Sequence, residues 1–272
     1  MKQRKESVRI PDLTKILKPT WLHEVGYRVN DSGWHKMKIF KQATNPIDPK
    51  ILTKLGIKKK EKVLAIAGYY GNWASELNKR GAKVTYSDIS KSMVAYVRKK
   101  VKPKFEEYIC SNYELIPKKP KEYDWTFTFE SCGGSQGLPI AYLRSLMNNK
   151  GGILVLYWNT ENRKAMGGKP KRYPLIVKTL ARIYGAKYEI KDINFRAYSG
   201  GTEIVTLLHK VYFLKTNSSA GKKAQFDLQL LDELKNKRKI KPKNKEEVAS
   251  LRRLNRLTKT LNKDFIKDLE IK

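Results

Sequence analysis

Short apolar runs alternate with segments of helical spacing from about Lys58 onward, and this alternation most constrains the fold. The first run, 63–67, holds five apolar residues in succession and is followed by Gly68. A continuous apolar run of this length is typical of a parallel strand that is buried on both faces. The next segment, 72–80, carries its apolar residues at helical spacing and is followed by a glycine, which favours a helix end. A strand followed by a helix is therefore predicted over 63–80.

The same alternation continues to about residue 214. Ser199 precedes two glycines near its end, and this sequence favours a hairpin between the last two strands. Together these patterns predict an α/β fold with a doubly wound, mostly parallel seven-stranded sheet and an antiparallel terminal hairpin. The further strands are expected at 84–86, 107–110, 125–129, 153–157, 188–195 and 203–214, and the further helices at 91–100, 139–147 and 173–184.

The length and composition fit one substantial core with appended segments. The chain has 272 residues, of which 40% are hydrophobic. Its first residues are polar and broken by prolines, and 216–221 is a small, polar segment typical of a linker. We therefore expect an N-terminal extension (1–50), an α/β domain (51–215) and a basic helical C-terminal extension (216–272).

The C-terminal extension combines basic residues with a helical pattern of apolar ones. Apolar residues recur every three or four positions from Val248 to Leu269, with lysines and arginines between them. This spacing predicts an amphipathic basic helix or a helical pair. Its leucine face could dock on the core and leave the basic face to phosphates, or the helix could simply be solvated. The candidate nucleic-acid contacts here are Lys235, Lys237, Arg238, Lys239, Arg252, Arg253 and Arg256.

The net charge points to a polyanionic partner. The chain has 58 lysines and arginines against 26 acidic residues, a formal charge of +32. Such a field attracts nucleic acid, and we favour RNA over DNA. Adaptation to heat can also enrich lysine, but it usually enriches glutamate as well, and here the acidic residues do not keep pace.

Several classes of protein are disfavoured by the same sequence. The N-terminus has no apolar stretch of the signal-peptide kind, and no segment approaches the roughly 18 apolar residues of a membrane helix. We therefore expect a soluble, cytoplasmic protein with no membrane partner. The two cysteines, Cys110 and Cys132, and the three dispersed histidines suggest neither a disulfide framework nor a metal site, so no metal is expected.

Four segments carry a resemblance to a known family. The run 55–71 resembles the entry to motif I of class I S-adenosylmethionine-dependent methyltransferases, and 77–93 resembles the continuation into the second strand with its acidic end. The segments 123–125 and 143–154 resemble motif IV and the fifth strand with its preceding helix. The resemblance covers about 50–214 and implies a Rossmann-like fold, methyl transfer and S-adenosylmethionine as the cofactor.

The candidate cofactor residues follow from the first strand–helix turns. A carboxylate at the end of the second strand, here Asp88, can accept hydrogen bonds from both ribose hydroxyls of a nucleoside. Glycines in the first turn let the backbone approach the ligand, because a Cβ would intrude. The resemblance implies contacts with the methionine, ribose and adenine parts. The candidate set is Ala67, Gly68, Tyr69, Gly71, Asp88, Ile89, Ser111, Asn112 and Glu130.

The turn also departs from the family pattern. Ala65 stands where a carboxylate is usual, and Ala67 and Tyr69 stand at positions usually held by glycine. The missing carboxylate normally helps to orient the cofactor, and a tyrosine in the turn can crowd the methionine moiety. These departures are the main support for an alternative in which a methyltransferase-like domain has lost catalysis.

Glu130 is the candidate catalytic residue. Methyl transfer from a sulfonium depends on alignment more than on acid–base groups. Glu130 follows the fourth strand and could act as a base or as a hydrogen-bond acceptor for the substrate, although a solvated loop carboxylate is an equal alternative. Cys132 could be a nucleophile, but burial as a free thiol is favoured.

The sequence thus predicts an S-adenosylmethionine-dependent methyltransferase that acts on RNA or another nucleic acid. One alternative is a catalytically inactive, methyltransferase-like module that binds nucleic acid. Another is a methyltransferase for a small molecule or a protein, with the positive charge incidental.

Overall fold

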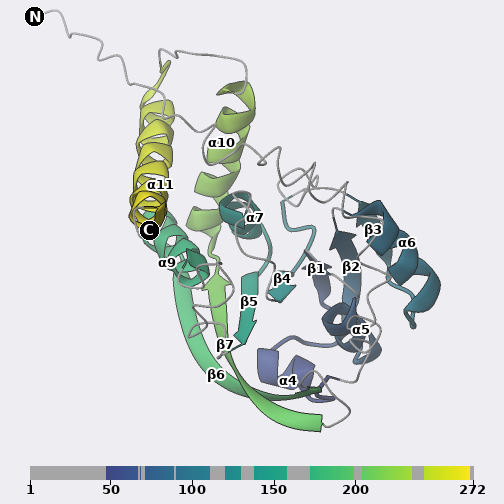
Figure 1. Ribbon diagram of the computed structural model, residues 1–272. Coiled ribbons are helices and arrows are strands. Elements are labelled where there is room, and N and C mark those ends of the chain that lie inside the picture. The colour runs from purple at the N-terminus through teal and green to yellow at the C-terminus, as the bar shows by residue number, and fades with distance from the viewer. Residues whose placement is uncertain are drawn as a thin grey trace, which may run out of the picture.

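The protein folds around a single seven-stranded sheet with strand order β3-β2-β1-β4-β5-β7-β6 (Figure 1). The fold is seen in a computed structural model that describes residues 47–66, 68, 71–88, 90–110, 120–129, 138–157, 172–198, 204–234 and 242–269. The strands are β1 (Lys62–Ala65), β2 (Lys83–Asp88), β3 (Glu107–Cys110), β4 (Trp125–Phe129), β5 (Gly151–Tyr157), β6 (Lys187–Tyr198) and β7 (Ile204–Lys215). The predicted doubly wound sheet is confirmed.

The direction of the strands creates a switch point at β1. β1 pairs in parallel with β2 on one side and with β4 on the other, and the chain moves outward from β1 in both directions. β7 then pairs antiparallel with both β5 and β6, which confirms the terminal hairpin. Ligands of doubly wound sheets bind at the carboxyl ends of the strands where the order reverses. Here that position is the end of β1, between β2 and β4.

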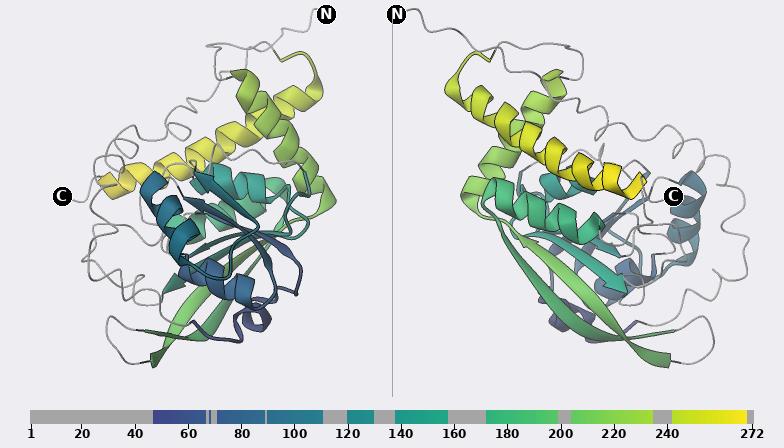
Figure 2. Two further views of the ribbon diagram at one scale, coloured as in Figure 1. Left: turned by 90° about the vertical axis from the view of Figure 1, so that its right-hand side faces the viewer. Right: turned by 60° about the vertical axis from the view of Figure 1, so that its left-hand side comes forward.

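Helices cover both faces of the sheet (Figures 1 and 2). Along β1 and the residue that follows it, Val63 and Ala65 pack into one core cluster and Leu64 and Ile66 into the other, because successive side chains of a strand point to opposite faces. The first face is covered by α4 (Ile51–Leu55), α5 (Asn72–Lys79) and α6 (Lys91–Lys100). The second is covered by α7 (Leu138–Ser145), α9 (Arg172–Tyr184), α10 (Ser218–Leu234) and α11 (Lys245–Leu269).

The prediction of a linker at 216–221 was wrong from Ser218 onward, because α10 begins there. Asn217 accepts a hydrogen bond from the backbone N–H of Ala220 at 2.9 Å, as residues that cap a helix do. Small residues then allow a close approach: a Cβ on Gly221 would lie 3.1 Å from the carbonyl oxygen of Leu146. The small and polar residues that resemble a linker are here the start of a packed helix.

The predicted amphipathic helix is α11, and it docks by its leucine face. Leu251, Leu254 and Leu257 are buried in the same core cluster as α7 and α9. One buried carboxylate, that of Asp227 on α10, joins this layer: it accepts hydrogen bonds from the Tyr184 hydroxyl at 2.8 Å and from Arg253 Nε at 2.9 Å. Three helices are therefore tied at a single point in the core.

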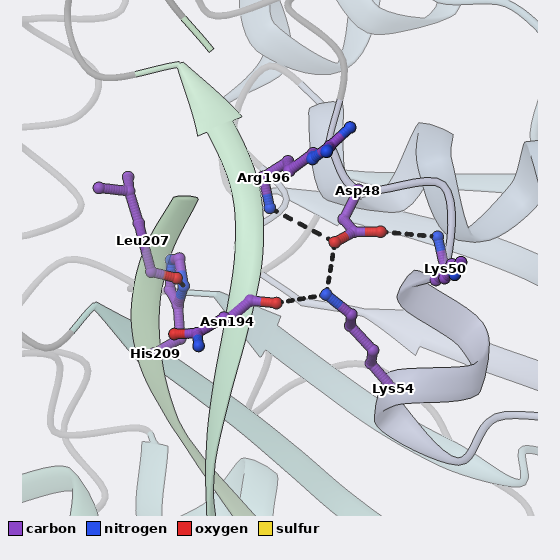
Figure 3. A network of polar contacts seen from close by, with 7 residues as sticks. All are labelled: Asp48, Lys50, Lys54, Asn194, Arg196, Leu207 and His209. Carbon is purple, nitrogen blue, oxygen red and sulfur yellow. Dashed lines mark hydrogen bonds and ion pairs between the residues drawn. The ribbon is translucent and has the colours of Figure 1, made fainter. Parts of the chain in front are cut away.

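The hairpin of β6 and β7 extends past the other strands (Figure 1), and its outer edge is covered at one end by the start of the described chain (Figure 3). The backbone N–H of Asp48 donates to the carbonyl oxygen of Arg196 at 3.0 Å. Lys54 on α4 donates both to Asp48 Oδ2 at 2.6 Å and to the carbonyl oxygen of Asn194. Burial alone would raise the pKa of Asp48, but hydrogen bonds from Lys54 and Lys50 lower it overall.

α4 was not predicted from the sequence.

In the part of the chain that the structure describes, no helix has both the length and the apolar character needed to cross a membrane.

Replacing Asp227 by alanine is expected to lower the free energy of unfolding by about 3 kcal/mol, because it leaves the half-buried Arg253 guanidinium and the buried Tyr184 hydroxyl without their acceptor. Denaturant unfolding followed by circular dichroism measures the change. Glu233→Ala, which removes an exposed carboxylate from the same helix, is the control and should change stability by less than about 0.5 kcal/mol. Equal stability of the two variants would contradict the assigned role of Asp227.

Candidate functional site

Three of the predicted cofactor residues lie in the described part of the chain: Gly68, Gly71 and Asp88. They come from the turn between β1 and α5 and from the last position of β2, so they meet at the switch point. The other predicted residues, Ala67, Tyr69, Ile89, Ser111, Asn112 and Glu130, lie outside the described residues.

Gly68 fastens the first turn to β2. Its backbone N–H donates to the carbonyl oxygen of Ser87 at 2.9 Å, one residue before Asp88. A Cβ at this position would lie 2.4 Å from Cε2 of the Tyr86 ring, which is closer than any real Cβ contact. The Tyr86 ring is fully buried and stacks on Phe105 with centroids 5.6 Å apart, so it has little room to move. The turn can therefore approach β2 this closely only with glycine at 68.

Gly71 ends the turn and begins α5. Its φ of +74° lies in the left-handed region, which side chains other than glycine rarely adopt. Its N–H donates to the carbonyl oxygen of Gly68 at 2.8 Å, and its own carbonyl oxygen accepts from Ser75 at 2.6 Å. The N-cap residue of α5 is Gly71 itself, which has no side chain with which to cap the helix. The positive end of this helix therefore faces the turn, where it favours a negatively charged group such as a carboxylate.

Asp88 places a carboxylate beside this turn. Its side chain is buried, and Oδ1 accepts a hydrogen bond from the backbone N–H of Ser90 at 3.0 Å. Ser90 in turn caps α6 by accepting from the N–H of Met93 at 3.1 Å, so the carboxylate is held by the start of a helix. A carboxylate has about four acceptor positions, and the contact with Ser90 is compatible with further hydrogen bonds from ribose hydroxyls.

The Tyr86 hydroxyl is held in its protonated form. Burial raises the pKa of Tyr86 well above its usual value, and the neighbouring Asp88 carboxylate raises it further. Tyr86 therefore stays neutral beneath the turn. A close backbone turn beside a buried carboxylate fits a nucleoside such as the adenosyl part of S-adenosylmethionine.

An aromatic cluster that the sequence did not predict lies at the end of β4. Trp73, in the first turn of α5, stacks on Phe129 with ring centroids 4.1 Å apart. His209 of β7 packs against both rings, at 5.7 and 5.8 Å, and Phe195 of β6 completes the group. Trp73 and Phe129 are half-buried, so the cluster forms an apolar surface at the end of β4. Glu130 is the next residue in the sequence after Phe129.

His209 is 1% exposed, and burial lowers its pKa to about 4. Its Nδ1 lies 3.0 Å from the carbonyl oxygen of Leu207. The imidazole is therefore neutral at physiological pH. The available sequence signal was its position in an apolar strand, where His209 shares a face with Val211 and Phe213.

The predicted nucleic-acid contacts divide into two groups. Lys235, Lys237, Arg238 and Lys239 lie outside the described residues. Arg252 and Arg256 are exposed on α11, whereas the Arg253 side chain is only 17% exposed and pairs with Asp227. Among the described residues, no group of three His, Cys, Asp or Glu side chains is arranged to hold a metal ion.

Comparison with known proteins matches part of this domain to a protein family. Residues 64–134, from β1 past the end of β4, match the family model described as methyltransferase domain. The resemblance to class I S-adenosylmethionine-dependent methyltransferases is therefore confirmed. Methyl transfer as the activity and S-adenosylmethionine as the cofactor are confirmed with it.

Solved structures similar to this chain include further methyltransferases. One is a SAM-dependent methyltransferase from Aquifex aeolicus, with 19% identity, a TM-score of 0.46, and coverage of 65% of this chain and 96% of that one. Another is the magnesium protoporphyrin IX methyltransferase of Synechocystis with bound SAM, with 12% identity, a TM-score of 0.42, and coverage of 75% and 96%. A comparison with curated proteins gave no match.

Asp88→Ala is expected to weaken S-adenosylmethionine binding by roughly 10- to 100-fold, because it removes the proposed acceptor for the ribose hydroxyls. Isothermal titration calorimetry measures the dissociation constant. Glu106→Ala removes an exposed carboxylate just before β3 and is the matched control. Unchanged affinity in Asp88→Ala, with the control also unchanged, would show that Asp88 does not hold the ribose.

The lowered pKa of His209 predicts a pH-dependent stability. The unfolded chain binds a proton at His209 near pH 6.5, but the folded chain does so only near pH 4. The contribution of the neutral His209 to the stability of the fold is therefore complete above about pH 6.5 and is lost as the pH falls toward 4. Between pH 7 and 5 the loss should be about 2 kcal/mol. Urea unfolding at several pH values tests this. In the variant His209→Phe, the loss of unfolding free energy between pH 7 and 5 should be smaller by about 2 kcal/mol than in the wild-type chain. An identical pH profile in both chains would contradict the assignment.

Proposed function

We propose that the methyl acceptor of this enzyme is RNA or another nucleic acid, with RNA favoured. The net charge of +32 is the observation that carries this proposal, because it creates a field that concentrates polyanions around the whole molecule. A small, uncharged acceptor would gain nothing from such a field.

The helices over the second face of the sheet supply a surface for the phosphates. α9 and α11 lie side by side (Figure 2). Their leucine and isoleucine sides are buried, and their outer sides carry exposed cations with no ion pair among the described residues. We call these cations the helical basic surface: Lys178, Arg182, Arg252, Arg256 and Lys259. Arg253 is left out of this surface because Asp227 binds its guanidinium.

The acceptor would reach the methyl group from the side of β4. The half-buried aromatic rings of Trp73 and Phe129 offer an apolar contact for a base at the end of this strand. Glu130 follows Phe129 directly, and we propose it as a base or as a hydrogen-bond acceptor for the substrate. Such contacts would accelerate transfer mainly by aligning the nucleophile with the sulfonium methyl group.

Transfer of labelled methyl groups tests the proposal. The full chain is incubated with radiolabelled S-adenosylmethionine and, in parallel, with total RNA, single-stranded DNA, protein extract and small-molecule extract. Label in RNA is the expected result, and it should fall in Asp88→Ala. Label only in the small-molecule or protein fraction would overturn the nucleic-acid substrate, and salt-sensitive RNA binding without any transfer would favour the inactive binding module.

The double variant Arg252→Glu with Arg256→Glu is expected to weaken RNA binding and to lower the slope of log affinity against log salt by about 1.4, or roughly 0.7 for each lost phosphate contact. Filter binding at several salt concentrations gives both quantities. The control is the double variant Lys58→Glu with Lys121→Glu, which changes the net charge equally. These two exposed lysines precede β1 and β4, so they lie at the amino ends of the strands and away from the site at the carboxyl ends. An equal loss in both pairs would show that only net charge matters.

A further inference from the structure

The outer edge of β6 has two parts that differ in how they are covered. At 194–196 the edge is covered by Asp48 and Lys54 (Figure 3). Over 187–193 no backbone hydrogen bond to the outer side is found among the described residues. Tyr188 and Ile190 lie in this open part with 48% and 40% of their surfaces exposed, and they are the exposed large hydrophobic residues of the described chain. An uncovered, partly apolar edge is a template for another strand.

The covered part reveals which backbone groups point outward. Asp48 receives the N–H of Arg196 and donates to its carbonyl oxygen, so both groups of Arg196 face away from β7. In an antiparallel pair this orientation repeats every second residue. The N–H and C=O groups of Tyr188, Ile190 and Asp192 therefore point outward as well, and they are the groups that an added strand would bond.

We propose that two copies of this chain pair through this open part of β6, antiparallel and with the two-fold axis at Ile190. Ile190 then faces Ile190 of the second copy, and Tyr188 faces Asp192, in hydrogen-bonded pairs that use the outward groups on both chains. The sheets of the two molecules become one continuous sheet.

The charges of the segment favour a second copy as the occupant. In this register Glu189 stands opposite Lys191 of the other chain, twice, at non-hydrogen-bonded positions where side chains approach most closely. Within one chain Glu189 already contacts Lys191 at 3.1 Å and Lys215, and these contacts lower its pKa, so it is charged near neutral pH. The two chains would join these pairs into one alternating network.

Neighbouring registers are less favourable. An axis at Glu189 or Lys191 also pairs the outward groups, but it places two like charges directly opposite each other at the axis. An axis at Asp192 also opposes like charges and brings the second strand against the part that Lys54 covers. An axis at Tyr188 leaves little overlap, because β6 begins at Lys187. The register centred on Ile190 avoids all of these costs.

The test begins with the mass of the full chain in solution, measured by sedimentation equilibrium at concentrations up to about 100 µM. A dimer is expected. Ile190→Pro removes an outward N–H, which an edge strand tolerates because that group has no backbone partner among the described residues. This variant should be a folded monomer, with the wild-type circular dichroism spectrum. A monomeric wild-type chain, or a dimer that persists in a folded Ile190→Pro variant, would overturn the proposal.

Charge reversal then tests the register, and it remains informative if the proline variant fails to fold. Glu189→Lys and Lys191→Glu each place like charges opposite one another and should weaken the dimer at least tenfold. The double variant restores opposite charges across the axis and should recover most of that loss. Glu233→Lys makes the same charge change on α10 and should leave the dimer unchanged. Additive losses in the double variant would contradict this register.

Discussion

The close approach of the first turn to β2 is the constraint on which the site depends. A Cβ at Gly68 would lie 2.4 Å from the Tyr86 ring, and that ring is fully buried and stacks on Phe105. Because the turn lies against β2, its backbone can bond Ser87, and Asp88 comes beside the start of α5. The three residues predicted from the family pattern thus depend on one packing contact. Tyr86 had no part in that pattern, although it explains why glycine is needed at 68.

The C-terminal helices link the core to the charge of the surface. Asp227 binds Tyr184 and Arg253, and this removes one arginine of α11 from solvent while it fixes the helix on α9. Leu251, Leu254 and Leu257 complete that contact. The remaining cations of the same helix then have only the outer side available, because the helical period separates them from the leucines. The basic face of α11 is therefore a consequence of how the helix packs.

The sequence predicted what depends on period and on local signals. The buried parallel strands, the carboxylate at the end of β2 and the amphipathic helix were all found, because each rests on a pattern that a single segment contains. The start of α10 was missed because Asn217 and Gly221, which cap a helix and allow its close packing, also occur in linkers. The aromatic cluster was missed for a different reason. Trp73, Phe129 and His209 come from three distant segments, and only the order of the strands brings them together.

The hairpin of β6 and β7 connects the open edge to the site. β7 carries His209 against Trp73 and Phe129, and β6 carries Phe195 into the same cluster. The part of β6 that Asp48 and Lys54 cover adjoins Phe195, so the covered edge supports the aromatic wall. Ile190, in the uncovered part, lies five residues before Phe195 along β6. Pairing with another strand there leaves these ring contacts undisturbed. Coverage of the edge is thus concentrated where the site requires a fixed strand.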